Sequence, residues 1–193
     1  MKSPERDVDF KKLSPAATAV SATGLGLVVK GATEINTLKG VLEVFAGRAA
    51  DGFDGSVARA LDQESDAGAI VDASFDKAGI GVISVAAWLN EAIPKPVIAG
   101  VVTKHLASAA LTFIHDHNHP NESFRPTKWG KASIGADSLA YAAYLAENAL
   151  RNEKPERITE QKIAHIVGGL AVGAAIVTGS ISIYQYYKRA FDK

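Results

Sequence analysis

The 193-residue sequence lacks cysteine, has no net charge and contains few long apolar runs. The absence of cysteine excludes disulfide bonds and thiolate metal sites. Lys and Arg balance Asp and Glu at 21 each, so the composition predicts no general affinity for nucleic acid. Residues 1–12 are charged and lack the apolar stretch of a secretory signal peptide. We therefore expect a short N-terminal segment, 1–12, followed by one domain, 13–193.

Segments long enough to cross a membrane are also scarce. The mean hydropathy is +0.05, and a spanning helix needs roughly 20 mostly apolar residues. Residues 163–187 meet this requirement, with 25 residues free of Asp, Glu, Lys and Arg, whereas 13–29 is borderline at 17. Other apolar segments are rich in Ala and Gly and are interrupted by charges.

The pattern nevertheless predicts an all-α chain. Six helical segments are expected, at about 13–31, 35–61, 68–90, 94–115, 132–150 and 160–187. Pro94 and Pro96 open the fourth, as proline does in a first helical turn. Gly24 and Gly26 lack the strand context of a dinucleotide fingerprint, so we interpret them as small residues that allow close helix packing.

Acidic and small residues recur at helical spacing between positions 51 and 76. The residues concerned are Asp51, Asp54, Gly55, Ala58, Arg59, Gly68, Asp72 and Asp76. Residues three and four apart share a helix face, so the first five form one stripe and the last three form another. Residues 61–67 are mostly polar and read as a turn. Two antiparallel helices would then bring four carboxylates face to face.

Such a cluster of carboxylates indicates a metal site. The carboxylates repel one another unless cations neutralise them. Oxygen ligands without cysteine suit Mg²⁺ or Mn²⁺, and two such ions can clamp a diphosphate. The small residues leave room for a nucleotide or phosphate, and Arg59 can pair with a phosphate oxygen. The alternative interpretation is a solvated helix face that carries unrelated acids.

The string D-x2-D-G-x2-A-R-x8-G-x3-D-x3-D resembles the signature of the CDP-alcohol phosphatidyltransferases, the membrane enzymes that make phospholipid head groups. The resemblance implies that Asp51, Asp54 and Asp72 ligate two divalent ions, and that Asp76 is both a ligand and the general base. It also implies a binding site for the CDP-lipid, made by Asp51, Gly55, Ala58, Arg59 and Gly68. In the implied reaction an alcohol attacks the lipid-linked phosphate of CDP-diacylglycerol, and CMP leaves.

The resemblance also implies a fold and a location. The family spans the membrane with six helices, so we expect a six-helix transmembrane bundle with a polar, metal-lined cavity on the cytoplasmic side. With both termini inside, the cytoplasmic segments carry eleven Lys and Arg residues and the outer loops carry five, in keeping with the positive-inside rule. This predicts a multi-pass protein of the cell membrane whose active site faces the cytoplasm. The family is commonly dimeric, and Ala- and Gly-rich faces would permit a homodimer.

Residues after the signature bear on the acceptor alcohol. Lys77, directly after Asp76, and the stretch 127–131 resemble phosphatidylglycerophosphate synthases, although the final K-T of their S-x-x-G-K-x-K-T stretch is absent. Four cations are expected to bind a phosphorylated acceptor, with glycerol 3-phosphate first: Lys77, Arg125, Lys128 and Lys131. The cations of 125–131 also fit an ordinary cytoplasmic loop. The D-A-x-x-D form at 72–76 resembles inositol-phosphate-type members, so a phosphatidylinositol-phosphate synthase remains an alternative.

Two other functional classes remain open. One is a soluble or peripheral metal-dependent helical enzyme that acts on a diphosphate, as isoprenoid synthases do, although the chain lacks their D-D-x-x-D clusters. The other is a non-catalytic homologue that binds CDP-lipid or serves as a membrane scaffold.

Histidines form the other conspicuous pattern. The string His115-Asp116-His117-Asn118-His119 contains alternating histidines that can bind Zn²⁺ or Ni²⁺. We interpret it instead as a solvated string in a loop after the fourth helix. His105 and His165 are expected to pack or to line polar cavities.

Overall fold

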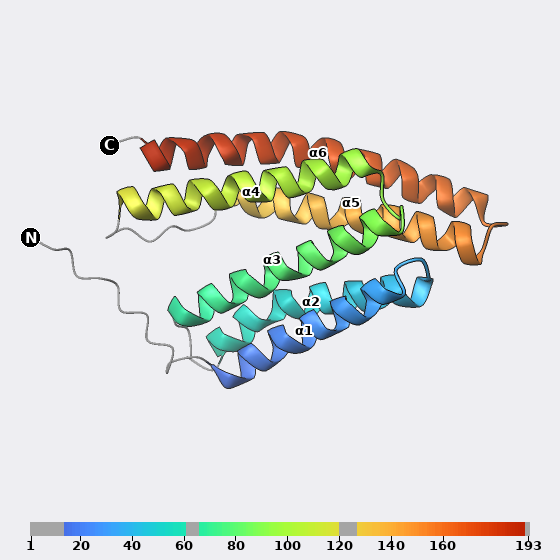
Figure 1. Ribbon diagram of the computed structural model, residues 1–193, viewed down its shortest axis with the longest axis horizontal. Helices are drawn as coiled ribbons and strands as arrows, with labels where there is room; N and C mark the ends of the chain where they lie inside the picture. The colour runs from blue at the N-terminus through green and yellow to red at the C-terminus, as the bar shows by residue number, and fades with distance from the viewer. Residues whose placement is uncertain (1–13, 61–65, 120–126, 192–193) are drawn as a thin grey trace, which may run out of the picture. The chain divides into compact units, whose positions relative to one another are not determined.

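The structure is a computed structural model whose described residues are 14–60, 66–119 and 127–191, without the side chains of residues 17, 51–60, 66–70, 72, 73 and 76. Every regular element in these ranges is an α-helix, which confirms the prediction of an all-α chain with six helices (Figure 1). The helices are α1 (Pro15–Thr33), α2 (Leu38–Ala60), α3 (Asp66–Leu89), α4 (Lys95–Asn118), α5 (Lys128–Glu153) and α6 (Ile158–Phe191).

The observed bounds differ from the prediction most at the start of α5 and at the end of α6, which reaches Phe191 instead of ending near residue 187. Helix α4 continues to Asn118 instead of ending near residue 115, and α5 begins at Lys128 instead of near residue 132. The early start of α5 has a local cause, because the backbone N–H of Gly130 donates to Oγ1 of Thr127 at 3.0 Å. Thr127 is therefore the N-cap of α5, since its hydroxyl satisfies an N–H that has no partner within the helix.

The chain divides into two compact units, and we call the first the N-terminal unit. It comprises α1, α2 and α3 together with residues 148–157. Helices α1 and α2 pack closely through glycines: a Cβ added at Gly31 would lie 2.7 Å from the backbone nitrogen of Val44. Gly24 lies in the same contact, but Gly26 has no atom within 4 Å of its Cβ position. The packing prediction is therefore confirmed for Gly24 and wrong for Gly26.

Asparagines join the helix ends within the N-terminal unit. The amide nitrogen of Asn36 donates to Oδ1 of Asn90 at 3.1 Å, and that of Asn148 donates to Oδ1 of Asn36 at 2.8 Å. Asn36 lies in the turn between α1 and α2, Asn90 follows α3, and Asn148 belongs to α5. These hydrogen bonds fix the turn that precedes α2 and so help to hold the helix that carries Asp51 and Asp54.

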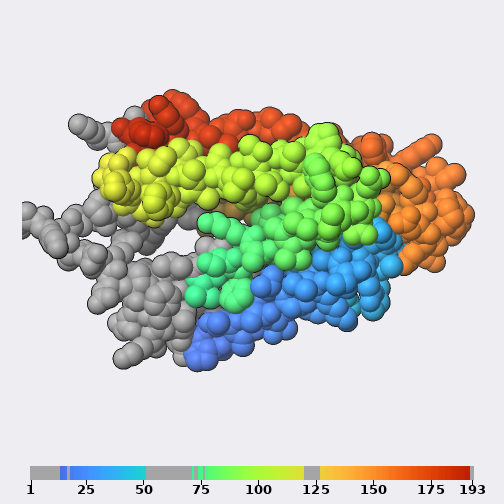
Figure 2. All heavy atoms as spheres, in the orientation of Figure 1, coloured from blue at the N-terminus to red at the C-terminus, as the bar shows by residue number. Residues whose placement is uncertain are grey.

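The C-terminal unit comprises residues 93–147 and 158–191 of the described chain. Helices α4 and α6 run parallel and pack against each other, as Figures 1 and 2 show. Helix α5 runs in the opposite direction and buries Ala140 and Leu145. On α6, a Cβ at Gly168 would lie 3.0 Å from the ring of Tyr144, so a small residue is needed for this contact with α5.

Among the described residues, two helices are long and apolar enough to cross a membrane, α4 and α6. Helix α6 contains the charge-free run 163–187, and this span prediction is confirmed by length and composition. Helix α1, which contains residues 15–29 of the borderline segment, does not qualify. Only 11% of the most apolar window of α4 and 28% of that of α6 is buried. The core helices of a soluble protein bury most of such a face, so this exposure favours a membrane location.

Charged side chains within the helices pair inside each unit. Nζ of Lys30 on α1 lies 2.6 Å from Oε1 of Glu43 on α2, and Nδ1 of His165 on α6 lies 3.0 Å from Oε2 of Glu147 on α5. Lys104 pairs with Asp137. Lys104 and Asp137 are largely buried, as paired charges inside a membrane bundle are expected to be, whereas the side chains of Lys30 and His165 are 58% and 63% exposed.

Candidate active site

Helices α2 and α3 carry all eight positions of the signature window, which we define as residues 51–76. Positions 51–59 lie in the C-terminal part of α2, and positions 68–76 lie in the N-terminal part of α3. The two helices are antiparallel neighbours in the N-terminal unit (Figure 1). The two signature segments therefore meet at the same end of this helix pair, as the sequence predicted. Asp66 is already helical, so the connection is shorter than the expected turn of 61–67.

The helical register groups the four signature aspartates, Asp51, Asp54, Asp72 and Asp76. The first pair is three residues apart on α2 and the second pair is four apart on α3, so each pair shares a helix face. The side chains of all eight signature residues lie outside the described part of the structure. The predicted ligand roles, the CDP-lipid contacts and the metal-lined cavity therefore remain predictions.

Arg48 is a cation beside the signature segments that the sequence analysis did not single out. It lies three residues before Asp51 on α2, and its Nη1 is 3.4 Å from the position of a Cβ added at Gly79. Gly79 is buried on α3, three residues after Asp76. The guanidinium therefore reaches from α2 to α3 one turn beyond the aspartates. The regular spacing of 48, 51 and 54 was the available signal, because it places a permanently charged group on the same helix face as Asp51 and Asp54.

The predicted acceptor-binding cations belong to two units. Lys77 is exposed on α3 in the N-terminal unit, whereas Lys128 and Lys131 are exposed on α5 in the C-terminal unit. The predicted loop position of Lys128 and Lys131 is wrong, because Thr127 caps the helix in front of them. They are three residues apart and share one helix face. Arg125 lies outside the described residues.

The structure also corrects the interpretation of the histidine string. Four of its five residues are helical, and His115 is only 4% exposed, so it is not a solvated loop residue. The rings of His115 and His119 lie 5.0 Å apart between centroids. Among the side chains that the structure describes, no group of three or more His, Asp or Glu residues is arranged to hold a metal ion. The prediction that His105 and His165 pack or line polar cavities is confirmed for His105, which lines a small cavity. The side chain of His165 is instead 63% exposed, and its Nδ1 lies 3.0 Å from Oε2 of Glu147.

Comparison with known proteins gives one finding at the level of families. The family model for CDP-alcohol phosphatidyltransferase matches residues 15–179. This range begins at the start of α1, includes the whole signature window and ends within α6. Comparisons with curated proteins and with solved structures give no significant match.

Proposed function

Because this chain belongs to the CDP-alcohol phosphatidyltransferase family, we propose that it transfers a phosphatidyl group from CDP-diacylglycerol to a phosphorylated alcohol, with CMP as the leaving group. The family is one of membrane transferases of phospholipid biosynthesis. The observation that carries the proposal is the intact signature window, whose two segments lie at one end of the antiparallel pair α2 and α3. An intact window also argues against a non-catalytic homologue, since every position that the reaction requires is kept.

The donor set of this window fits two Mg²⁺ or Mn²⁺ ions. The four signature aspartates supply only oxygen ligands, and hard divalent cations prefer such ligands. Bound there, the ions would neutralise the diphosphate and stabilise charge on the attacking and leaving oxygens. Arg48 lies one helical turn before Asp51 on α2, and its positive charge would lower repulsion among carboxylates gathered there.

The residues of the chain have distinct roles in this proposal. Asp51, Asp54 and Asp72 hold the ions, and Asp76 also accepts the proton of the acceptor hydroxyl as it attacks. Arg59 pairs with a phosphate oxygen of the CDP-lipid. The small residues of the window, Gly55, Ala58 and Gly68, let the nucleotide approach the helix backbone.

The proposed acceptor is glycerol 3-phosphate. Lys77 follows the proposed general base directly, and Lys128 and Lys131 are exposed in the first turn of α5. A helix N-terminus presents unpaired N–H groups and a positive dipole end, which favour a phosphate beside these lysines. An inositol phosphate is the second candidate acceptor, because the window has the form D-A-x-x-D at 72–76.

The proposal includes six membrane spans in the cell membrane, with the signature aspartates toward the cytoplasm, and a homodimer formed through Ala- and Gly-rich helix faces. Two observations support the membrane location. Helices α4 and α6 leave most of their apolar windows exposed, and the distribution of Lys and Arg follows the positive-inside rule.

A CMP-release assay tests this function. The purified protein in detergent is incubated with CDP-diacylglycerol, Mg²⁺ and one of five acceptors: glycerol 3-phosphate, inositol phosphate, glycerol, serine or choline. We expect rapid CMP release with glycerol 3-phosphate, none after chelation of Mg²⁺, and none from the matched variant Asp51→Asn. Absence of CMP release with every acceptor would contradict the transferase proposal. Turnover confined to the unphosphorylated alcohols would contradict the acceptor assignment alone.

A further inference from the structure

Arg48 reaches from α2 to the backbone of α3. Its Nη1 lies 3.4 Å from the position of a Cβ added at Gly79, and among the described residues no other atom lies within 4 Å of that position. Gly79 is buried, whereas Gly81 on the same helix is exposed and has no atom within 4 Å of its Cβ position. The absence of a side chain at position 79 therefore leaves room for the guanidinium against α3.

The helical register places this contact beside both segments of the signature window. Arg48 is three residues before Asp51 on α2, and Gly79 is three residues after Asp76 on α3. Three residues rise about 4.5 Å along an α-helix, which is less than one turn. The side chain of Arg48 therefore starts within one turn of the first signature aspartate and ends within one turn of the last. Charges at such short separations interact strongly where little water screens them.

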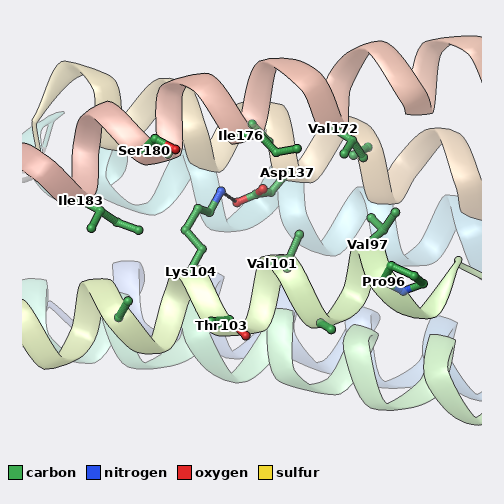
Figure 3. A pocket seen from close by; sticks show the side chains of 16 residues that line it. Pro96, Val97, Val101, Thr103, Lys104, Asp137, Val172, Ile176, Ser180 and Ile183 are labelled. Atoms are coloured by element: carbon green, nitrogen blue, oxygen red, sulfur yellow. Dashed lines mark hydrogen bonds and ion pairs between the residues drawn. The ribbon is translucent and has the colours of Figure 1, made fainter.

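Lys104 shows how another interior cation of this chain is neutralised. In the C-terminal unit, Nζ of Lys104 on α4 donates to Oδ2 of Asp137 on α5, whose side chain is only 5% exposed (Figure 3). The lysine and the carboxylate cancel each other's charge. The signature positions instead hold four aspartates and Arg59, so the addition of Arg48 still leaves a surplus of negative charge for divalent ions.

We propose that Arg48 is a positioning residue: it is a permanent counter-ion that holds the metal-binding ends of α2 and α3 together while no divalent ion is bound. The inference rests on the metal site of the proposed function and concerns the same aspartates. Arginine keeps its charge at every working pH, so the empty site always retains a cation that reduces the repulsion among carboxylates. The same charge repels an incoming Mg²⁺ ion, so Arg48 stabilises the empty site and weakens metal binding.

Thermal unfolding with and without metal tests this role. The full chain in detergent is unfolded in EDTA and in saturating Mg²⁺, as wild type and as Arg48→Met, which has an uncharged side chain. In EDTA the Tm of Arg48→Met should be lower by about 3 °C or more, and Mg²⁺ should recover most of this loss, because the ions replace the missing charge. Arg48→Lys keeps the charge and should behave like the wild type. A loss of Tm that is equal in EDTA and in Mg²⁺ would mean that Arg48 only packs, and would overturn the proposal.

Metal affinity gives a second readout that a packing role would not change. Binding of Mn²⁺ to the same proteins is followed by electron paramagnetic resonance, which detects the free ion. Arg48→Met should bind Mn²⁺ about tenfold more tightly than the wild type, because a nearby positive charge has been removed. Arg48→Lys should retain the wild-type affinity. Unchanged or weaker binding of Mn²⁺ by Arg48→Met would contradict the proposed counter-ion.

Matched leucine variants test the contact with α3. A side chain at position 79 would displace the guanidinium, whereas one at position 81 would enter open space. Gly79→Leu should therefore lower the Tm more in EDTA than in Mg²⁺, and Gly81→Leu, with the same change in helix propensity, should respond to Mg²⁺ like the wild type. Equal responses of the two variants would contradict the contact. This pair also decides the question where Arg48→Met does not fold in either solution.

These measurements contain no CDP-lipid and no acceptor, so they are independent of turnover. If the variants and the wild type respond equally to Mg²⁺, the inference about Arg48 fails even where CMP is released. Absence of CMP release with the expected response to Mg²⁺ would contradict the transferase proposal alone.

Discussion

The packing of α1 on α2 predicts that replacing glycine with alanine raises the stability of the protein at position 26 and lowers it at position 31. Gly26 and Gly31 both lie on α1, and replacing either with Ala gains about 0.8–1.0 kcal/mol of helix propensity. At Gly26 the new Cβ meets nothing within 4 Å. At Gly31 it would lie 2.7 Å from the nitrogen and 2.9 Å from Cγ2 of Val44 on α2. A backbone atom cannot rotate away, so the two helices must separate.

The magnitude follows from the comparison of the two variants. Overpacking of a tight contact costs about 1–3 kcal/mol, and the gain in helix propensity is the same in both variants. The difference in unfolding free energy between Gly26→Ala and Gly31→Ala should therefore equal the packing cost alone. At about 2–4 °C per kcal/mol for a chain of this size, the two Tm values should differ by about 2–12 °C, with Gly26→Ala above the wild type.

Thermal unfolding by circular dichroism in one detergent measures this difference. Gly31→Ala should also lower CMP release at a temperature where both variants are folded, because α2 carries Asp51 and Asp54. Equal Tm shifts in the two variants, or a more stable Gly31→Ala, would refute the inferred contact between α1 and α2.

Further predictions concern the reaction. Changing any one of the first three signature aspartates to Asn removes a charged metal ligand, so CMP release at saturating Mg²⁺ should fall to background, and near-normal turnover would exclude that residue as a required ligand. Asp76→Asn should lower turnover about 10²–10⁴-fold while CDP-diacylglycerol affinity changes much less; loss of CDP-lipid binding with residual turnover intact would make it a ligand only. Lys128→Ala or Lys131→Ala should raise the acceptor KM about 10- to 150-fold and leave the KM for CDP-diacylglycerol nearly unchanged. Arg59→Ala should show the reverse pattern in steady-state kinetics, and identical patterns would assign these cations to one substrate.

Much of the candidate site could be predicted from the spacing of its residues in the sequence. Whether Asp51 and Asp54, or Asp72 and Asp76, share a face depends only on helical register, which is a local property of the chain. The spacing of the window therefore predicted both the antiparallel helix pair and the family. The start of α5 was local as well, since Thr127 is a favourable N-cap residue three positions before Gly130. That signal was present in the sequence and was not used.

Contacts between distant segments were decided by the tertiary structure. Gly24, Gly26 and Gly31 have the same chemistry, but α2 covers only part of the surface of α1, so Gly26 remains open while Gly31 is in tight contact. Lys104 and Asp137 are 33 residues apart and pair because α4 and α5 bring them together. Their charges lowered the apparent hydropathy of the chain, although both side chains are largely buried. The sequence spacing alone thus determined the chemistry of the signature window. Helix packing determined which small residues are required and which charges are paired, because whether a helix face is covered depends on another segment of the chain.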